Sequence, residues 1–144
     1  MIYEEIKMDL FTVSEDHYLA HCISSDFAMS GGIAVPFDRK FSLKRQFNQI
    51  KKKNPSQLNH PTCILLGRIF NLITKKNVWD KPTYDTMTTA LKKMKKLCLD
   101  KGIKKIAMPK IGCGIDRLEW SKVSEIIKDI FSNTEIEILV CYID

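Results

Sequence analysis

The segment Ile103-Lys104-Lys105-Ile106-Ala107-Met108-Pro109-Lys110-Ile111-Gly112-Cys113-Gly114-Ile115-Asp116 joins a short apolar run to a loop with two glycines. Its first part, Ile103 to Met108, is rich in residues that favour β-strands. After the loop comes an amphipathic stretch, about Glu119 to Phe131, in which apolar residues recur at helical spacing. A strand, a loop and a helix in this order predict one unit of a layered α/β domain.

Similar strand and helix patterns extend outward from this unit in both directions. Further strand candidates are Ile2 to Met8, Tyr18 to Ser24, Thr62 to Arg68, Phe70 to Lys75 and Ile136 to Ile143. The clearest helix runs from about Thr83 to Lys101, with Thr83 as its N-cap. Earlier in the chain we expect a short helix that is broken near Pro36, and another that starts around Ser42. The alternation predicts an α/β fold with a largely parallel sheet.

Length and composition limit the class of protein. The 144 residues suit a single domain over residues 1–144, and 44% hydrophobic with 28% charged residues excludes intrinsic disorder. The balance of 23 Lys+Arg against 17 Asp+Glu gives a net charge of +6. This charge permits an anionic partner without identifying one.

The five cysteines are scattered without a C-x-x-C pair, which predicts reduced thiols in the cytoplasm. Because the cysteines and histidines lack the paired spacing of zinc ligands, we expect no metal. The acidic N-terminus is unlike a signal peptide, and no apolar run approaches about 18 residues. We therefore expect a soluble, intracellular protein without a membrane partner.

Two loops of small residues each follow a predicted strand. They are Ser30-Gly31-Gly32-Ile33 and Ile111-Gly112-Cys113-Gly114-Ile115. Exposed backbone N–H groups before a helix favour a phosphate, although a tight turn explains the first loop alone equally well. The second loop lacks the last glycine of a dinucleotide fingerprint and the Lys-Ser/Thr of a P-loop. Because ligands of open α/β sheets lie at the carboxyl ends of the strands, the two loops together predict a bound pyrophosphate.

Lys75 ends a predicted strand, and Asp116 lies in the glycine loop. A lysine at a strand end is commonly a surface residue whose stem packs on apolar neighbours. The alternative is a partly desolvated amine of lowered proton affinity, which could form a Schiff base with a sugar aldehyde. Asp116 is either a general acid or base beside that lysine, or a turn aspartate.

Three further residues have competing interpretations. His21, on an apolar strand, fits a hydrogen-bonded core histidine better than a catalyst. Cys113 lacks a placed histidine partner, which disfavours a thiol nucleophile. Asp9, directly after the first strand, either accepts a hydrogen bond from an exocyclic amine or caps a turn.

Six motifs, in order and without large gaps, resemble those of the macrodomains, and most of all the terminal ADP-ribose protein glycohydrolase branch. They are Lys7-Met8-Asp9-Leu10-Phe11, Ala20-His21-Cys22-Ile23-Ser24, Gly31-Gly32-Ile33-Ala34, Leu72-Ile73-Thr74-Lys75-Lys76, Lys81-Pro82-Thr83-Tyr84 and Met108 to Leu118. The glycine loop alone is similar to the corresponding loop of any macrodomain. The presence of both Lys75 and Asp116 narrows the resemblance to this branch. The resemblance implies a three-layer α/β/α sandwich around a mixed, mostly parallel six-stranded sheet.

The same resemblance implies an ADP-ribose site at the strand ends. The family's lysine nucleophile falls on Lys75, its acidic partner on Asp116, and the aspartate that holds the adenine amine on Asp9. The two glycine loops face the diphosphate and the distal ribose. Other residues that it brings to the ligand are Leu10, His21, Ser24, Thr74, Pro109 and Tyr142. Trp79, in the loop after Lys75, is expected to pack over the neighbouring helix rather than to contact substrate.

The implied activity is a hydrolase that removes terminal mono-ADP-ribose from acidic side chains through a covalent lysine intermediate, without a cofactor. Deacylation of O-acetyl-ADP-ribose is a further activity that the resemblance allows. The expected partners are ADP-ribose and mono-ADP-ribosylated macromolecules, protein rather than nucleic acid, and the expected state is a monomer. Two alternatives are a non-catalytic ADP-ribose reader and a hydrolase of ADP-ribosylated nucleic acid.

Overall fold

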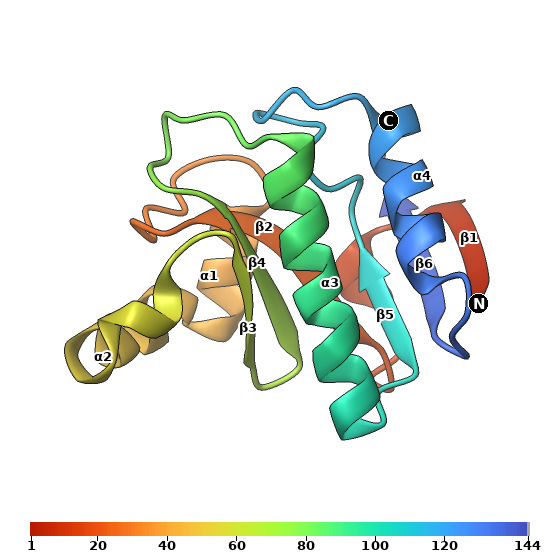
Figure 1. Cartoon of the computed structure of the whole chain (residues 1–144), viewed down its shortest axis with the longest axis horizontal. Helices are drawn as coiled ribbons and strands as arrows, with labels where there is room; N and C mark the ends of the chain where they lie inside the picture. The colour runs from red at the N-terminus through yellow and green to blue at the C-terminus, as the bar shows by residue number, and fades with distance from the viewer. Residues whose placement is uncertain (144) are drawn as a thin grey trace.

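Six strands form one mixed sheet in the order β1-β6-β5-β2-β4-β3 in a computed structural model that describes residues 1–143 (Figure 1). The strands are β1 (Ile2–Lys7), β2 (Tyr18–Ser24), β3 (Thr62–Leu66), β4 (Ile69–Lys75), β5 (Lys105–Met108) and β6 (Glu137–Tyr142). Every neighbouring pair is parallel except β3 and β4, which are antiparallel. The prediction of an α/β fold with a mixed, mostly parallel six-stranded sheet is confirmed.

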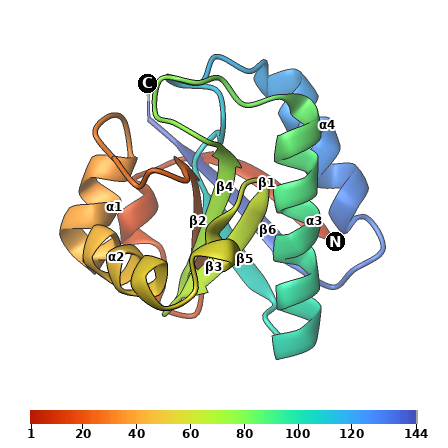
Figure 2. The same ribbon diagram turned by 60° about the vertical axis from the view of Figure 1, so that its left-hand side comes forward.

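Two pairs of helices cover the two faces of the sheet (Figure 2). On one face lie α1 (Ala34–Phe41) and α2 (Leu43–Lys53), and on the other lie α3 (Tyr84–Lys101) and α4 (Trp120–Phe131). Two 3-10 turns, η1 (Leu10–Thr12) and η2 (Pro55–Leu58), complete the regular structure. Within residues 1–143, no helix is long and apolar enough to cross a membrane. The arrangement is the three-layer sandwich that was expected.

The inner strands of the sheet are buried between two apolar cores, as expected for parallel strands that carry helices on both faces. Strand β4 shows this best, because all seven of its residues are buried. Its alternate side chains Phe70 and Leu72 join the core under α3 and α4, whereas Ile69 and Ile73 join the core under α1 and α2. The alternation shows which side chains of β4 face each core.

The helix start at Thr83 is confirmed, and the predicted break at Pro36 is wrong. Thr83 accepts a hydrogen bond from the Thr86 N–H and forms a capping box, as an N-cap residue should. Pro36 is the third residue of α1, where a backbone N–H would lack a partner within the helix anyway, so the ring is tolerated. The chain breaks instead at Ser42, whose φ of 53° separates α1 from α2.

All five parallel strands end at the same edge of the sheet, because only β3 runs in the opposite direction. This edge is the carboxyl-end crevice in which open α/β sheets bind their ligands. Along it, β1 and β4 are separated by the three strands β6, β5 and β2, which corresponds to about 19 Å at the usual strand spacing. Residues that follow β1 and β4 therefore lie far apart along this edge.

His21 is a core residue, as the interpretation of its apolar strand predicts. Its side chain is fully buried and stacks on Phe37, with ring centroids 4.1 Å apart. The Asn71 amide N–H groups donate to the carbonyls of Ile64 and Ile69, so its Oδ1 faces the ring and accepts from His21 Nε2 at 2.6 Å. Burial lowers the pKa of His21 to about 4, although the Asn71 hydrogen bond opposes this.

We expect His21 to make stability fall as the pH falls from about 6.5 towards 4. The unfolded chain takes up a proton there that the folded chain does not, so the contribution reaches about 3 kcal/mol at pH 4. Urea unfolding of wild type and His21→Gln at pH 7 and pH 4 measures it. The wild type should lose more free energy of unfolding than the variant, and equal losses would contradict the assignment.

Candidate active site

A cavity of about 380 Å³ opens at the carboxyl ends of β2, β4 and β5. Its walls are residues 22–24, 29–34, 109–112 and 114–116, together with Lys75 and Val78. The volume is within the range of small-molecule sites. A second cavity of about 410 Å³ lies between β3 and α3, and the described residues that line it include two lysines but no carboxylate. The first cavity is therefore the one that brings acid, base and glycine loops together.

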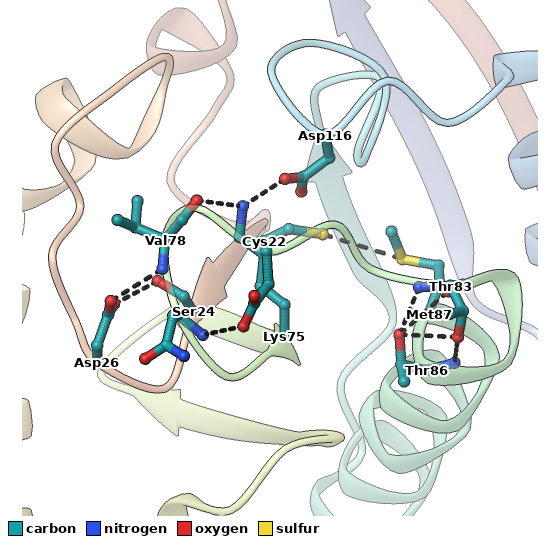
Figure 3. Close-up of polar contacts among 11 residues, drawn as sticks. Cys22, Ser24, Asp26, Lys75, Val78, Thr83, Thr86, Met87 and Asp116 are labelled. Atoms are coloured by element: carbon teal, nitrogen blue, oxygen red, sulfur yellow. Dashed lines mark hydrogen bonds and ion pairs between the residues drawn. The ribbon is translucent and has the colours of Figure 1, made fainter.

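An ion pair between Lys75 and Asp116 lies in the wall of this cavity (Figure 3). Lys75 Nζ is 2.6 Å from Asp116 Oδ1, and the two side chains are only 8% and 14% exposed. The same amine donates to the Val78 carbonyl at 3.1 Å. Lys75 is therefore a buried amine with two acceptors, and the surface-lysine interpretation is wrong.

Two features bring these side chains together from positions 41 residues apart. Lys75 is the last residue of β4, a strand that is buried along its whole length. Asp116 lies in the loop after β5, in which Arg117 N–H donates to the Gly114 carbonyl and Leu118 N–H to the Gly112 carbonyl. The folded loop thus presents its carboxylate to the end of β4.

The two glycine loops face each other across the cavity. A Cβ atom on Gly31 would lie 2.7 Å from Cδ1 of Ile115, so a side chain at this position would require Ile115 to move. The Ile115 side chain is 65% exposed and lies over the gap between the loops.

Both loops offer backbone donors. Within the described chain, no acceptor is bonded to the N–H groups of Gly32, Ile33, Gly114 and Ile115. The first loop leads into α1, whose N-cap residue makes no side-chain capping bond. Unpaired N–H groups at a helix start attract anions, which supports the predicted pyrophosphate site.

Most of the site residues expected from the sequence line this cavity. They are Ser24, Ser30, Gly31, Gly32, Ile33, Lys75, Pro109, Ile111, Gly112, Gly114, Ile115 and Asp116. The structure thus brings the proposed nucleophile, its acidic partner and both glycine loops around one space.

The other expected residues lie outside the cavity wall, at the same edge or beneath it. Asp9 accepts a hydrogen bond from Phe11 N–H and caps η1, as its turn interpretation predicts, and Leu10 is buried. His21 and Thr74 are buried in the core, and the Thr74 hydroxyl has no partner among the described residues. Tyr142, at the end of β6, lies under the Lys110 amine at 4.6 Å from the ring centroid.

Cysteine chemistry is disfavoured here. Burial raises the pKa of Cys113 to about 11, and its Sγ faces the Ile111 carbonyl. Burial likewise raises the pKa of Cys22 well above its usual range, and the Asp116 charge adds to the shift. Both thiols are therefore protonated at neutral pH and are poor nucleophiles.

The sequence reasoning missed Val78 and assigned Trp79 wrongly. Val78 contacts the amine only because the chain turns back after Lys75, where Asp80 accepts from the Asn77 N–H. No local sequence pattern predicts that turn. Trp79 is 78% exposed, so it does not pack over a helix. Lys110, which also lines the cavity, lies inside the glycine-loop motif and could have been included on that ground.

Comparison with known proteins gives both sequence and structural matches. The family model of the Macro domain matches residues 20–127. The chain is 43% identical to ADP-ribose glycohydrolase OARD1 of Homo sapiens over 137 residues, covering 94% of this chain and 88% of that protein.

Among solved structures, the macrodomain of Thermus aquaticus DarG aligns with a TM-score of 0.86 at 19% identity, covering 99% of both chains. The structure of Thermosipho africanus DarTG in complex with ADP-ribose aligns with a TM-score of 0.82 at 20% identity, covering 95% of this chain and 40% of that one. At these identities the structural matches show the fold.

Gly112 should be the less replaceable glycine of the second loop. It has a φ of 74°, and an added Cβ would lie 2.7 Å from Met87 Cε and 3.0 Å from Leu118 Cδ1. We expect Gly112→Ala to lower the free energy of unfolding by about 1–3 kcal/mol.

Gly114→Ala is the matched control, because no heavy atom lies within 4 Å of its added Cβ. We expect a change within about 0.5 kcal/mol in the control. Urea unfolding of both variants measures the difference, and equal destabilisation would contradict this account of the loop.

Proposed function

Because the chain belongs to the macrodomain family, we propose that it is an ADP-ribose glycohydrolase whose active site is the cavity around Lys75 and Asp116. The observation that carries the proposal is the buried ion pair of these two side chains between two glycine loops. A binding module needs the loops, but it does not need a buried amine at the end of the site.

The position of the pair fits a ligand that lies along the carboxyl edge of the sheet. The loops after β5 and β2 stand between the Asp9 end of the row and the Lys75 end. A diphosphate on the loops places one ribose towards β1 and the distal ribose towards β4. The anomeric carbon of the distal ribose then faces the Lys75 amine.

Lys75 is the proposed nucleophile and Asp116 the proton shuttle. Asp116 accepts a proton from the Lys75 ammonium, and the neutral amine attacks the anomeric carbon. The bond from that carbon to the acceptor oxygen breaks, and the oxygen keeps the electron pair and takes the proton from Asp116. Asp116 then accepts a second proton from the nitrogen that has bonded to the sugar.

Hydrolysis of this intermediate regenerates the enzyme. The sugar ring opens to a Schiff base between Lys75 and the ribose carbon, water adds to that carbon, and the amine leaves with a proton. The products are free ADP-ribose and Lys75 in its starting state. The two-step route replaces one difficult displacement with two easier ones.

The proposed substrate is terminal mono-ADP-ribose on an acidic side chain of a protein. A carboxylate is a good leaving group, so attack by one amine suffices to break the bond. The substrate is macromolecular, and Trp79, which follows the cavity-lining Val78, is exposed and free to contact it.

Removal of either member of the ion pair should separate binding from turnover. We expect Lys75→Ala to lower ADP-ribose release from an automodified protein by at least about 1,000-fold, and Asp116→Asn by about 100- to 10,000-fold. The dissociation constant for ADP-ribose should change only a few-fold in both variants, because the glycine loops remain. Chromatography of released ADP-ribose and calorimetry measure the two quantities.

Lys76→Ala is the matched control, because Lys76 is the neighbouring lysine and is exposed. It should keep wild-type release and binding. Unchanged release in both Lys75→Ala and Asp116→Asn would exclude the mechanism. Binding without release in the wild type would establish a non-catalytic ADP-ribose reader instead.

A further inference from the structure

Asp26 connects the end of β2 to the turn that follows Lys75 (Figure 3). Its Oδ1 accepts hydrogen bonds from Ser24 Oγ at 2.5 Å and from Ala28 N–H at 3.1 Å. Its Oδ2 accepts from Val78 N–H at 2.8 Å. Both carboxylate oxygens are thus used, and one of them reaches a residue 52 positions away in the chain.

The backbone around Asp26 is fixed to the strand that carries the nucleophile. The β2–β4 register shifts between Ile23 and Ser24, so that Ser24 pairs with Lys75. Beyond the strand, Ser25 N–H donates to the Lys75 carbonyl at 2.9 Å and Asp26 N–H to the Lys76 carbonyl at 3.1 Å. The carboxylate is therefore held at a set position relative to the Lys75 backbone.

The charge of Asp26 suits its three donors. Burial would raise the pKa of this carboxyl, but hydrogen bonds from Ser24, Val78 and Ala28 outweigh that effect, and the Lys75 charge acts in the same direction. The net result is a pKa below the usual range. Asp26 is thus a carboxylate at neutral pH, and its exposed side chain keeps it partly solvated.

The turn that Asp26 holds supplies the second acceptor of the Lys75 amine. Val78 N–H donates to Asp26, and the Val78 carbonyl accepts from Lys75 Nζ at 3.1 Å. A neutral amine has two N–H donors and one lone pair in tetrahedral directions. Val78 O and Asp116 Oδ1 lie in two of these three directions. They therefore set the rotation of the amine about its Cε–Nζ bond, and with it the direction of the lone pair once Asp116 has taken a proton.

We propose that Asp26 is a positioning residue of the nucleophile, which aims the Lys75 amine by holding the Val78 carbonyl against it. The inference rests on the proposed lysine mechanism. In this role Asp26 does not contact the ligand, because Asp26 is not among the residues that line the cavity. Its loss should thus slow the attack on the sugar without weakening ADP-ribose binding.

Replacement of Asp26 by asparagine removes the charge and one of the two acceptor oxygens while it keeps the shape. We expect Asp26→Asn to lower kcat for ADP-ribose release at least 10-fold, with KM and the dissociation constant for ADP-ribose within about two-fold of wild type. Asp26→Glu keeps the carboxylate, and its exposed position accommodates the extra methylene. It should therefore recover most of the lost kcat.

Asp38→Asn is the matched control. Asp38 also accepts a backbone N–H, that of Lys44 at 2.9 Å, but it lies at the α1–α2 junction outside the cavity wall. It should keep the wild-type kcat, even if its melting temperature falls. Thermal unfolding of every variant separates a loss of stability from a loss of rate.

Two results would overturn the positioning role alone. One is a wild-type kcat in Asp26→Asn, and the other is a loss of kcat that is matched by an equal loss of ADP-ribose affinity. A loss that Asp26→Glu does not recover also overturns it, because the carboxylate would then not be what matters. If the wild type itself releases no ADP-ribose, the proposed function fails and the positioning role fails with it.

Discussion

The contact between Lys75 and Asp116 is the constraint on which the rest of the structure depends. An isolated ammonium is expensive to bury, and a buried pair is tolerated only when its geometry and its additional hydrogen bonds are good. Here the amine meets a carboxylate at 2.6 Å and a carbonyl at 3.1 Å. Strand β4 carries Lys75 to this place, the loop after β5 brings Asp116, and the turn after β4 brings the carbonyl. An apolar residue at position 75 would suit a merely structural site better, so the pair indicates chemistry.

The positive potential that serves the ligand does not come from the net charge of +6. The lysines at the end of α2, and most of those on α3, are exposed and lie away from the cavity wall. In the proposed function the diphosphate instead meets the backbone N–H groups of Gly32, Ile33, Gly114 and Ile115, which bond no acceptor within the described chain. Such donors are fixed by the fold, so they orient the ligand while Lys75 and Asp116 act on it. This division of labour explains why a reader and a hydrolase can share the same loops.

Much of the fold could be predicted because local signals agree with tertiary packing. The Thr83 cap, the alternation in β4 and the glycine loops each have a pattern that reads the same in isolation and in the structure. The break predicted at Pro36 was wrong because a proline is tolerated in the first turn of a helix. The sequence does not show where α1 begins, so it does not show that Pro36 lies in that turn. Trp79 misled because a large apolar side chain was assumed to find a partner.

Residues of the candidate site could be predicted where they lie in a family motif. They could not be predicted where their role depends on a contact with a residue far away in the sequence. Lys75 and Asp116 are 41 positions apart; the residues alone left their pairing open, and the resemblance favoured it. Val78 and Asp26 escaped because their roles depend on a turn that folds back on the end of β2. Val78 acts through its backbone N–H and carbonyl, which carry no sequence signature, and the Asp26 carboxylate has a role only through that N–H.

The central claim is that Lys75 forms a covalent bond with the distal ribose. Borohydride reduction of the enzyme during turnover, followed by intact mass measurement and peptide mapping, tests it most directly. The account predicts an added mass of one reduced ADP-ribose unit on the peptide that contains Lys75, and no adduct in Lys75→Ala. Turnover without any adduct, or with an adduct on another residue, would contradict it.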